Sequence, residues 1–353
     1  MISVYRWDPD RKDCAWHSGP ELPAAKAADL PPSCVCWIDL ENPTPEEEHL
    51  IFESFLPVHK LTLEDVTKPR REAEAGIHFP KVEEFPDYLF VINNPLRPEI
   101  LKSGGCTPKD LRARHRTNLQ LSAVLTRRVL ITHHYEPLHS VSEVRDFLCR
   151  HSGQAERGPD YLFHLVLDAM VDEYAPIVDG IADSLDSIES RVFKRPSPQL
   201  LSRLLRLKRL IVALRKTLIL EREVLYRLTR GEFELVETRE IAYYRNVYDH
   251  LVRYAELTEG AREMVSDLMQ THLSAVSNNL NGIMKVLTMI STVILPMALI
   301  TGVYGMNFQR LWPDITWEYG FWFAVGLMAL SGLVSLLFFY WKGWIGGKTP
   351  PPH

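Results

Sequence analysis

Two apolar stretches near the C-terminal end of the chain constrain its fold more than any other feature. They run from about Met284 to Val303 and from Phe321 to Trp341. Each is about twenty residues long, the length that a helix needs to cross the hydrocarbon core of a bilayer. The second stretch carries no charged residue and has aromatic residues at both ends, as at a membrane interface. We therefore predict two transmembrane helices rather than a pair of buried core helices.

The charges that flank these spans predict their orientation. The connecting segment, residues 304–320, contains both acidic and basic residues, whereas the tail, residues 342–353, contains Lys342 and Lys348 and no acid. Positive charge is enriched on the cytoplasmic side of membrane proteins. The tail is therefore predicted to be cytoplasmic and the connecting loop to be periplasmic or extracellular. Because two spans return the chain to the side it came from, the N-terminal part is predicted to be cytoplasmic as well, at the plasma (inner) membrane.

Residues 1–158 predict an α/β domain. Three segments are rich in β-branched and aromatic residues and end in turn formers, namely CVCWIDLEN, DYLFVINNPL and NLQLSAVLTRRVLITHH. The segment TPEEEHLIFESF has the features of a helix start, since Thr44 can cap the helix and Pro45 suits its first turn. The segment LKSGGCTPKDLRARHRTN predicts a basic loop.

The composition argues against several classes of function. The net charge is -5 and the isoelectric point is near 6.2, whereas nucleic-acid binding normally requires a basic face. No phosphate-cradling glycine loop and no nucleophile elbow occurs in the sequence. We therefore expect no nucleic-acid partner, no organic cofactor, no ATP-driven step and no enzymatic activity.

Residues 159–240 contain two consecutive helical stretches of opposite charge. The stretch from Asp160 to Glu189 contains no lysine or arginine, and the stretch from Leu201 to Arg230 is mostly basic. We expect an antiparallel hairpin in which the opposite charges face each other. Two alternatives stay open: the charges form solvated helix faces, which the sequence alone favours, or the acidic stretch holds counter-cations near a pore mouth.

Residues 241–303 predict one helix of exceptional length. No proline occurs between Ile241 and Pro296, and apolar residues recur at spacings of three and four. A helix of about sixty residues is roughly 90 Å long at a rise of 1.5 Å per residue. We expect this helix to run from the cytoplasm through the membrane, with its transmembrane part at about 284–303, and to pack against other helices.

One stripe of the first span is smaller and more polar than the other faces. At alternating spacings of three and four, it consists of Asn281, Met284, Thr288, Ser291, Leu295, Ala298 and Gly302. Such a stripe serves either tight helix packing or the lining of a pore. One chain has too few spans to enclose a pore, so either role requires an oligomer. A buried amide at Asn281 is costly without water or a partner, and the stripe points toward Asn307, so we favour a pore.

The pore stripe, as we call these seven residues, predicts a hard and hydrated ion. No Asp or Glu lies between Asp267 and Asp314, and no His or Cys lies between His272 and His353. A site for bare Zn²⁺ would offer imidazole or thiolate ligands. Amide oxygens suit a cation that keeps its water, and Mg²⁺ loses water reluctantly. The residues alone therefore favour Mg²⁺.

The segment YGMN, directly after the first span, resembles the Gly-Met-Asn signature of the CorA magnesium channels and transporters. The resemblance extends through SNNLNGIMKVLTMISTVILPMALITGVYGMNF and to YYRNVYDH, DYLFHLVLDAMVDEY and LTLEDV. It implies a funnel-shaped homopentamer with an α/β cytoplasmic domain, long helices and two C-terminal transmembrane helices. It also implies that Gly305, Met306 and Asn307 form the selectivity filter, supported by Tyr304. Asn281, Met284 and Leu287 match pore-lining positions, the last two at a hydrophobic constriction.

The resemblance further implies a regulatory divalent-cation site between cytoplasmic domains of neighbouring subunits. Glu64, Asp65 and Asp168 match its carboxylates. Their partner on the long helix is commonly aspartate and is Asn246 here, while a second acidic position is Gln270. Since ligands for such ions are mostly carboxylates, these amides weaken the expected gating by internal Mg²⁺.

The function that follows is uptake of Mg²⁺ down its electrochemical gradient, with Co²⁺ or Ni²⁺ as competitors. The expected partners are copies of the same chain, the lipid bilayer and divalent cations. One alternative is a Zn²⁺ transporter of the same fold, against which Met306 argues. Another is a cytoplasmic sensor whose spans only anchor it and do not conduct.

Overall fold

The computed structural model describes residues 1–8, 15–19, 26–71, 77–97, 119–192, 197–306 and 318–345. The chain divides into two compact units, Met1–Met269 and Gln270–His353. The segment 101–118, for which the sequence predicts a basic loop, lies outside the described residues.

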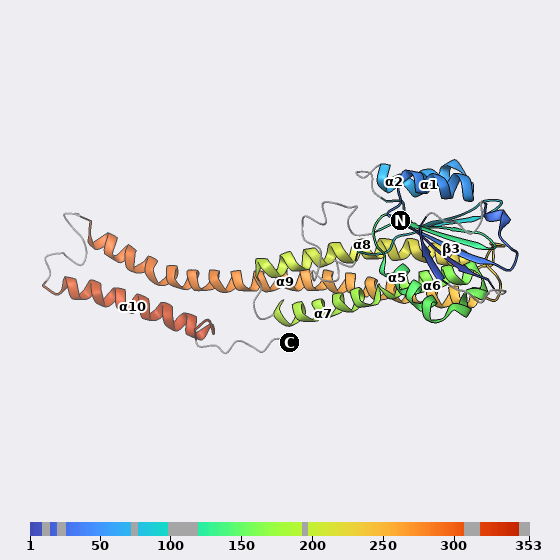
Figure 1. Ribbon diagram of the computed structural model, residues 1–353. Coiled ribbons are helices and arrows are strands. Elements are labelled where there is room, and N and C mark those ends of the chain that lie inside the picture. The colour runs from blue at the N-terminus through green and yellow to red at the C-terminus, as the bar shows by residue number, and fades with distance from the viewer. Residues whose placement is uncertain are drawn as a thin grey trace. The chain divides into compact units, whose positions relative to one another are not determined.

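A mixed β-sheet of seven strands organises the first unit (Figure 1). Its order is β2-β1-β3-β7-β6-β5-β4, in which β3 and β7 are parallel and all other neighbours are antiparallel. The strands are β1 Ile2–Trp7, β2 Ala15–Ser18, β3 Val35–Glu41, β4 Lys81–Glu84, β5 Leu89–Asn93, β6 Leu121–Leu125 and β7 Val129–His134. The predicted α/β domain is confirmed.

Helices cover both faces of this sheet, which accounts for the buried, β-branched strands. One face packs against short elements, namely α1 Pro45–His49, the π-helical turn η2 Leu50–Phe55 and α2 Lys60–Arg71. The other face packs against α5 His139–Arg150, the 3-10 turn η3 Ser152–Arg157 and α6 Pro159–Asp172. Neighbouring residues alternate between the faces, so Trp37 joins the core against α5 and α6, whereas Ile38 joins the core against α2. A third short turn, η1, spans Ala27–Asp29.

The predicted helix start at Thr44 is confirmed. The Thr44 side chain accepts a hydrogen bond from the backbone amide of Glu47, and the Glu47 carboxylate accepts one from the backbone amide of Thr44. This is a complete capping box with Pro45 in the first turn.

The acidic stretch forms two helices, not one: α6 and α7 Ala175–Val192. Pro176 explains the break, because it lacks an amide hydrogen and is tolerated only in the first turn of a helix. The break is further fixed by Tyr174, whose buried hydroxyl donates to the carbonyl of Asn94 at 3.2 Å.

The expectation that opposite charges face each other in the following hairpin is wrong. Helix α8, Pro198–Thr229, lies against α7, but no ion pair joins the two helices in the part of the chain that the structure describes. The seam is apolar, with Leu185 and Ile188 of α7 and Leu204 and Ile211 of α8 in one buried cluster. The acidic side chains of α7, namely Asp179, Asp183, Asp186 and Glu189, are exposed. An apolar seam stabilises the pair without desolvating these charges.

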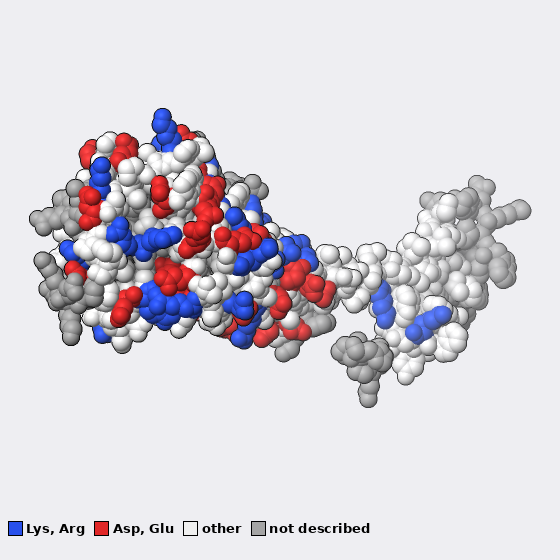
Figure 2. All heavy atoms as spheres, turned by 90° about the vertical axis from the view of Figure 1, so that its right-hand side faces the viewer, with Lys and Arg blue, Asp and Glu red and all other residues white. Residues whose placement is uncertain are grey.

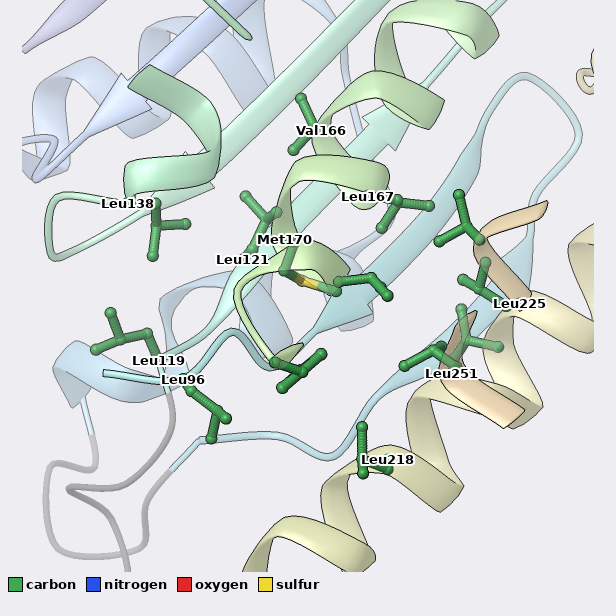
Figure 3. Packing of buried hydrophobic residues seen from close by; sticks show 14 of the residues in the cluster. Leu96, Leu119, Leu121, Leu138, Val166, Leu167, Met170, Leu218, Leu225 and Leu251 are labelled. Atoms are coloured by element: carbon green, nitrogen blue, oxygen red, sulfur yellow. The ribbon is translucent and has the colours of Figure 1, made fainter. Parts of the chain in front are cut away.

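Helix α9, Ile241–Tyr304, is continuous over 64 residues. Within the first unit its apolar residues complete the core formed by the sheet, α6 and α8, and Figure 3 shows Leu251 beside Leu225 in this cluster. Met170 and Leu167 of α6 lie in the same cluster and connect these helices to Leu121 of β6.

The N-terminal end of α9 is held by a cluster of aromatic and charged residues. The Arg157 guanidinium lies 3.8 Å from the Tyr161 ring and 4.3 Å from the Tyr243 ring, and it forms an ion pair with the buried Glu240 at 2.6 Å. His164 of α6 lies against the Tyr243 ring at a centroid distance of 5.3 Å and against Tyr244 at 5.8 Å. These contacts connect α6 and η3 to the first turn of α9.

The environment of His164 predicts a loss of stability in acid. Burial lowers the pKa of His164 from its ordinary value of 6.5 to about 4, and the charge of Arg157 adds to this shift. Between these values the unfolded chain binds a proton that the folded chain does not, so stability falls as the pH drops below 6.5. The contribution lost by pH 5 is about 2 kcal/mol. His164→Phe preserves the ring stacking and should remove this part of the loss.

The measurement is the thermal unfolding midpoint of the purified protein and of His164→Phe at pH 7.5 and pH 5. The wild type should lose more stability on acidification than the variant does. Midpoints that fall in parallel would show that His164 is not a source of acid sensitivity.

Candidate functional site

The second unit contains two helices that are long and apolar enough to cross a membrane, α9 and α10 Gly320–Trp341. The last turns of α9 lie antiparallel to α10. The Thr301 hydroxyl donates to the Met328 sulfur at 3.4 Å, and a side chain at Gly332 would collide with the end of Met297. Gly332 is buried, so its missing side chain lets the helices approach closely at this point.

A single face of α9 makes these contacts. Its partly buried residues recur mostly at spacings of three or four and comprise Lys285, Met289, Val293, Pro296, Met297, Ile300 and Tyr304. They form the α9–α10 seam. Tyr304, which resemblance assigned to support of the filter, therefore lies on the side of α9 that faces α10.

The pore stripe lies on the other side of α9. At about 100° per residue, the centre of the stripe is roughly opposite the centre of the α9–α10 seam. All seven of its residues are exposed in the single chain, and so is Leu287. Leu295 is 73% exposed and Met284 57% exposed. The hairpin of one chain thus leaves this face without a partner in the part of the chain that the structure describes.

The hydroxyl groups along α9 are bonded locally. Thr288 donates to the carbonyl of Met284 at 2.8 Å, and Thr292 donates to that of Thr288 at 2.8 Å. A threonine hydroxyl that donates to its own helix keeps acceptor lone pairs toward its surroundings. On the stripe, Thr288 therefore presents an acceptor to whatever occupies the space beside it.

The end of α9 explains one of the signature glycines. The amide of Gly305 donates to the carbonyl of Thr301 at 2.9 Å, and a β-carbon at Gly305 would lie 3.1 Å from that same oxygen. Glycine thus permits a close approach of the chain to this carbonyl. Met306 is exposed, and Asn307 lies outside the described residues.

The expected regulatory residue Asp65 is already paired within its own chain. Its Oδ2 accepts from the Lys81 ammonium at 2.5 Å, and its Oδ1 lies 2.8 Å from His78 Nε2. Burial alone would lower the pKa of Lys81, but its hydrogen bonds to Asp65 and Glu83 outweigh this effect and raise it. The pKa of His78 is lowered by burial, which keeps its imidazole neutral at pH 7. One carboxylate oxygen of Asp65 therefore accepts a hydrogen bond from Lys81, and the other lies beside His78.

The other expected regulatory residues are spread over separate elements. Glu64 is exposed on α2, Asp168 is half-buried on α6 and Asn246 is exposed on α9. Burial raises the pKa of Asp168, and the nearby Asp172 adds to this effect. Within the described parts of the chain, no three histidine, cysteine or acidic residues form a group that could hold a metal ion. The structure does not bring these four residues into one site within a protomer.

Comparison with known proteins bears on this geometry. The family model described as CorA-like Mg²⁺ transporter protein matches residues 33–341. The cobalt/magnesium transport protein CorA of Thermotoga maritima is 32% identical over 82% of this chain and 78% of its own. The divalent cation transporter CmaX of Pseudomonas aeruginosa is 25% identical over 84% of this chain and 83% of its own.

The fold is also that of a solved transporter. The complete structure of the CorA magnesium transporter from Methanocaldococcus jannaschii matches with a TM-score of 0.78 at 21% identity, over 98% of this chain and 99% of that one. Fold and sequence together define a divalent-cation transporter with two membrane helices, which is not an enzyme. The chain belongs to the CorA-like Mg²⁺ transporter family.

The pairing of Asp65 predicts how the N-terminal unit responds to Mg²⁺. Lys81→Met removes the ammonium and leaves one carboxylate oxygen of Asp65 without that donor. An ion can then replace the ammonium, so added Mg²⁺ should raise the unfolding midpoint more in Lys81→Met than in the wild type. Lys60→Met is the matched control, since Lys60 is exposed at the start of α2, the helix that carries Asp65. This variant should respond to Mg²⁺ as the wild type does. Equal shifts in all three proteins would show that Lys81 does not compete with a cation.

Proposed function

We propose that this protein is a homopentameric channel that carries Mg²⁺ into the cytoplasm, with Co²⁺ and Ni²⁺ as competitors. The observation that carries the proposal is the exposed pore stripe of α9, which lies away from α10 and needs copies of the same helix to cover it. In this arrangement α9 lines the axis and α10 forms the outer ring. Family membership supports both the ion class and the assembly.

The proposed selection acts on the hydrated ion. Asn281 and Asn307 would contribute rings of amide oxygens at the two ends of the stripe, with no net charge. Gly305 and Met306 would complete the filter, and Met284 and Leu287 would form an apolar constriction. An ion that retains its water is bound through hydrogen bonds from its water molecules to acceptor oxygens, and not by direct ligands. This mode of binding fits the reluctance of Mg²⁺ to dehydrate.

The proposed topology places both termini in the cytoplasm of a multi-pass protein of the inner membrane. A divalent cation that moves inward across a negative-inside potential gains about 4.6 kcal/mol per 100 mV, twice the value for one charge. This gradient is sufficient to drive uptake without a coupled reaction.

We propose that internal Mg²⁺ regulates this protein weakly at most. Lys81 donates to one oxygen of Asp65 and His78 lies beside the other. Asn246 offers an amide where a carboxylate would bind more strongly. Glu64 and Asp168 remain available to a neighbouring subunit, but two carboxylates bind such an ion less tightly than a full set.

The test of the proposal is Mg²⁺ uptake into proteoliposomes at a negative-inside potential, with Zn²⁺ uptake measured in parallel. Asn307→Ala should reduce Mg²⁺ flux by tenfold or more, because it removes the amide ring at the mouth. Asn279→Ala removes an exposed amide from α9 away from the pore stripe and should leave flux within about twofold of the wild type.

The alternatives give different results in the same experiment. Zn²⁺ flux without Mg²⁺ flux would replace the proposed ion while retaining the channel. A properly assembled wild-type protein that moves neither ion would instead be a membrane-anchored sensor.

A further inference from the structure

Two lysines interrupt the apolar surface of the second unit. In its described residues, 270–306 and 318–345, Lys285 and Lys342 are the only lysines or arginines. Glu318, at the other end of α10, is the only acidic residue there. Figure 2 shows two basic patches on an otherwise uncharged surface of this unit. No ion pair involves either lysine within the described residues, so both ammonium groups lack a carboxylate counter-ion there.

A turn at the end of α10 places a tryptophan beside the first of these lysines. Gly343 adopts a left-handed φ of 70°, which a side chain would disfavour. The chain consequently folds back, and the amide of Trp344 donates to the carbonyl of Phe339 at 2.8 Å. The Trp344 ring stacks on Phe339 at a centroid distance of 5.4 Å and an interplanar angle of 21°.

Lys285 lies over this ring. Its ammonium is 5.3 Å from the centroid of Trp344, and its side chain is half-buried in the α9–α10 seam. The aliphatic part of Lys285 therefore packs between the helices while its charge reaches the level at which α10 ends. The ammonium of Lys342 lies 5.9 Å from the Trp341 ring in the same turn of chain. Two pairs of a lysine and a tryptophan thus lie at the end of the apolar segment, since Trp341, Lys342 and Trp344 are close in sequence and Lys285 lies over Trp344.

An ammonium group at this position gains more from pairing with an anion than it would on a surface exposed to water. Trp341 and Trp344 mark an interface with the headgroup region, where the dielectric constant is below that of water and charge pairing is stronger. A cation over an aromatic face is partly stabilised, but an aromatic ring does not neutralise its charge. Two unpaired ammonium groups at one interface therefore form a site for a group with negative charge.

We propose that Lys285 and Lys342, positioned by Trp344 and Trp341, bind the phosphate of an anionic phospholipid in the leaflet on the side of residues 1–269. The acyl chains would run along the exposed apolar face of α10, where Leu336, Leu337 and Phe338 are each about half exposed. The membrane supplies such a lipid at high local concentration, whereas a soluble phosphate lacks the apolar contact. The inference goes beyond transport and requires only that both helices lie in a bilayer.

The experiment measures binding without ion flux. Detergent-purified full-length protein is titrated with phosphatidylglycerol, with phosphatidylcholine of the same acyl chains and with glycerol phosphate, and the unfolding midpoint is followed. The variants are Lys285→Gln/Lys342→Gln, with Arg310→Gln as a charge-removal control in the loop between the spans. Glutamine keeps two of the four methylene groups of lysine and stays polar at its end, so the double variant should fold.

The wild type and Arg310→Gln should be stabilised by phosphatidylglycerol at a concentration well below that of phosphatidylcholine. The double variant should need roughly 30-fold more phosphatidylglycerol, on the basis of the free energy contributed by each basic residue near an anionic surface. Raising the salt concentration should reduce the preference of the wild type.

Three outcomes would overturn the proposal. Equal responses to the two lipids would exclude recognition of an anion, and an unchanged response in the double variant would exclude these lysines. A response to glycerol phosphate as strong as that to the lipid would identify a soluble anion site. Because no ion is transported in this assay, the transport proposal can fail while the lipid site stands, and the reverse also holds.

Discussion

Inside a bilayer every backbone amide and carbonyl must be hydrogen-bonded within the protein, so a chain crosses as a helix or as part of a closed barrel. This chain has two helices that are long and apolar enough to cross a membrane. Each helix forms its own backbone hydrogen bonds, but two helices do not enclose a pore. The α9–α10 seam uses one side of α9 and leaves the opposite side, with Asn281, Thr288 and Ser291, exposed. A polar face of this kind is stable in a membrane only beside water or protein. Assembly with further copies of the chain follows from this requirement, whereas the proposed number of five subunits rests on the resemblance to the family.

Helix α9 also belongs to the first unit, so it connects the packing of that unit to the apolar helices. Helix α9 is continuous from Ile241 to Tyr304, and its first turn is fixed to α6 and η3 by Arg157, Glu240 and the surrounding aromatic rings. Any change in the packing of α6 or α8 against α9 therefore acts on the element that bears the pore stripe. If the first unit controls conduction, helix α9 provides a continuous connection for that control.

Much of the fold could be predicted because its strongest signals are local. Length and hydropathy predicted the two apolar helices, and the absence of proline between Ile241 and Pro296 predicted a continuous helix. Thr44 with Pro45 predicted a capped helix start. The break between α6 and α7 was missed, although Pro176 signalled it. The charged hairpin was wrongly predicted to pair its charges, because composition does not show which side of a helix faces its neighbour. The link between Asp65 and Lys81 joins a helix to a strand, and no local pattern indicates such a contact. The position of Asn307 lies outside the described residues, and its role stays a prediction.

The central claim is that the side of α9 turned away from α10 faces water in the assembled protein. Thiol reactivity measures this directly, with Ser291→Cys on the pore stripe and Ile290→Cys on a neighbouring face, where Ile290 is 51% exposed in the single chain. A charged thiol reagent that does not cross membranes is applied to reconstituted protein, and the unmodified sequence sets the background from its own cysteines. We expect Ser291→Cys to react and its ion flux to be blocked, while Ile290→Cys stays at background. Equal protection of both positions, or reaction at position 290 alone, would contradict the pore and make the stripe a packing surface.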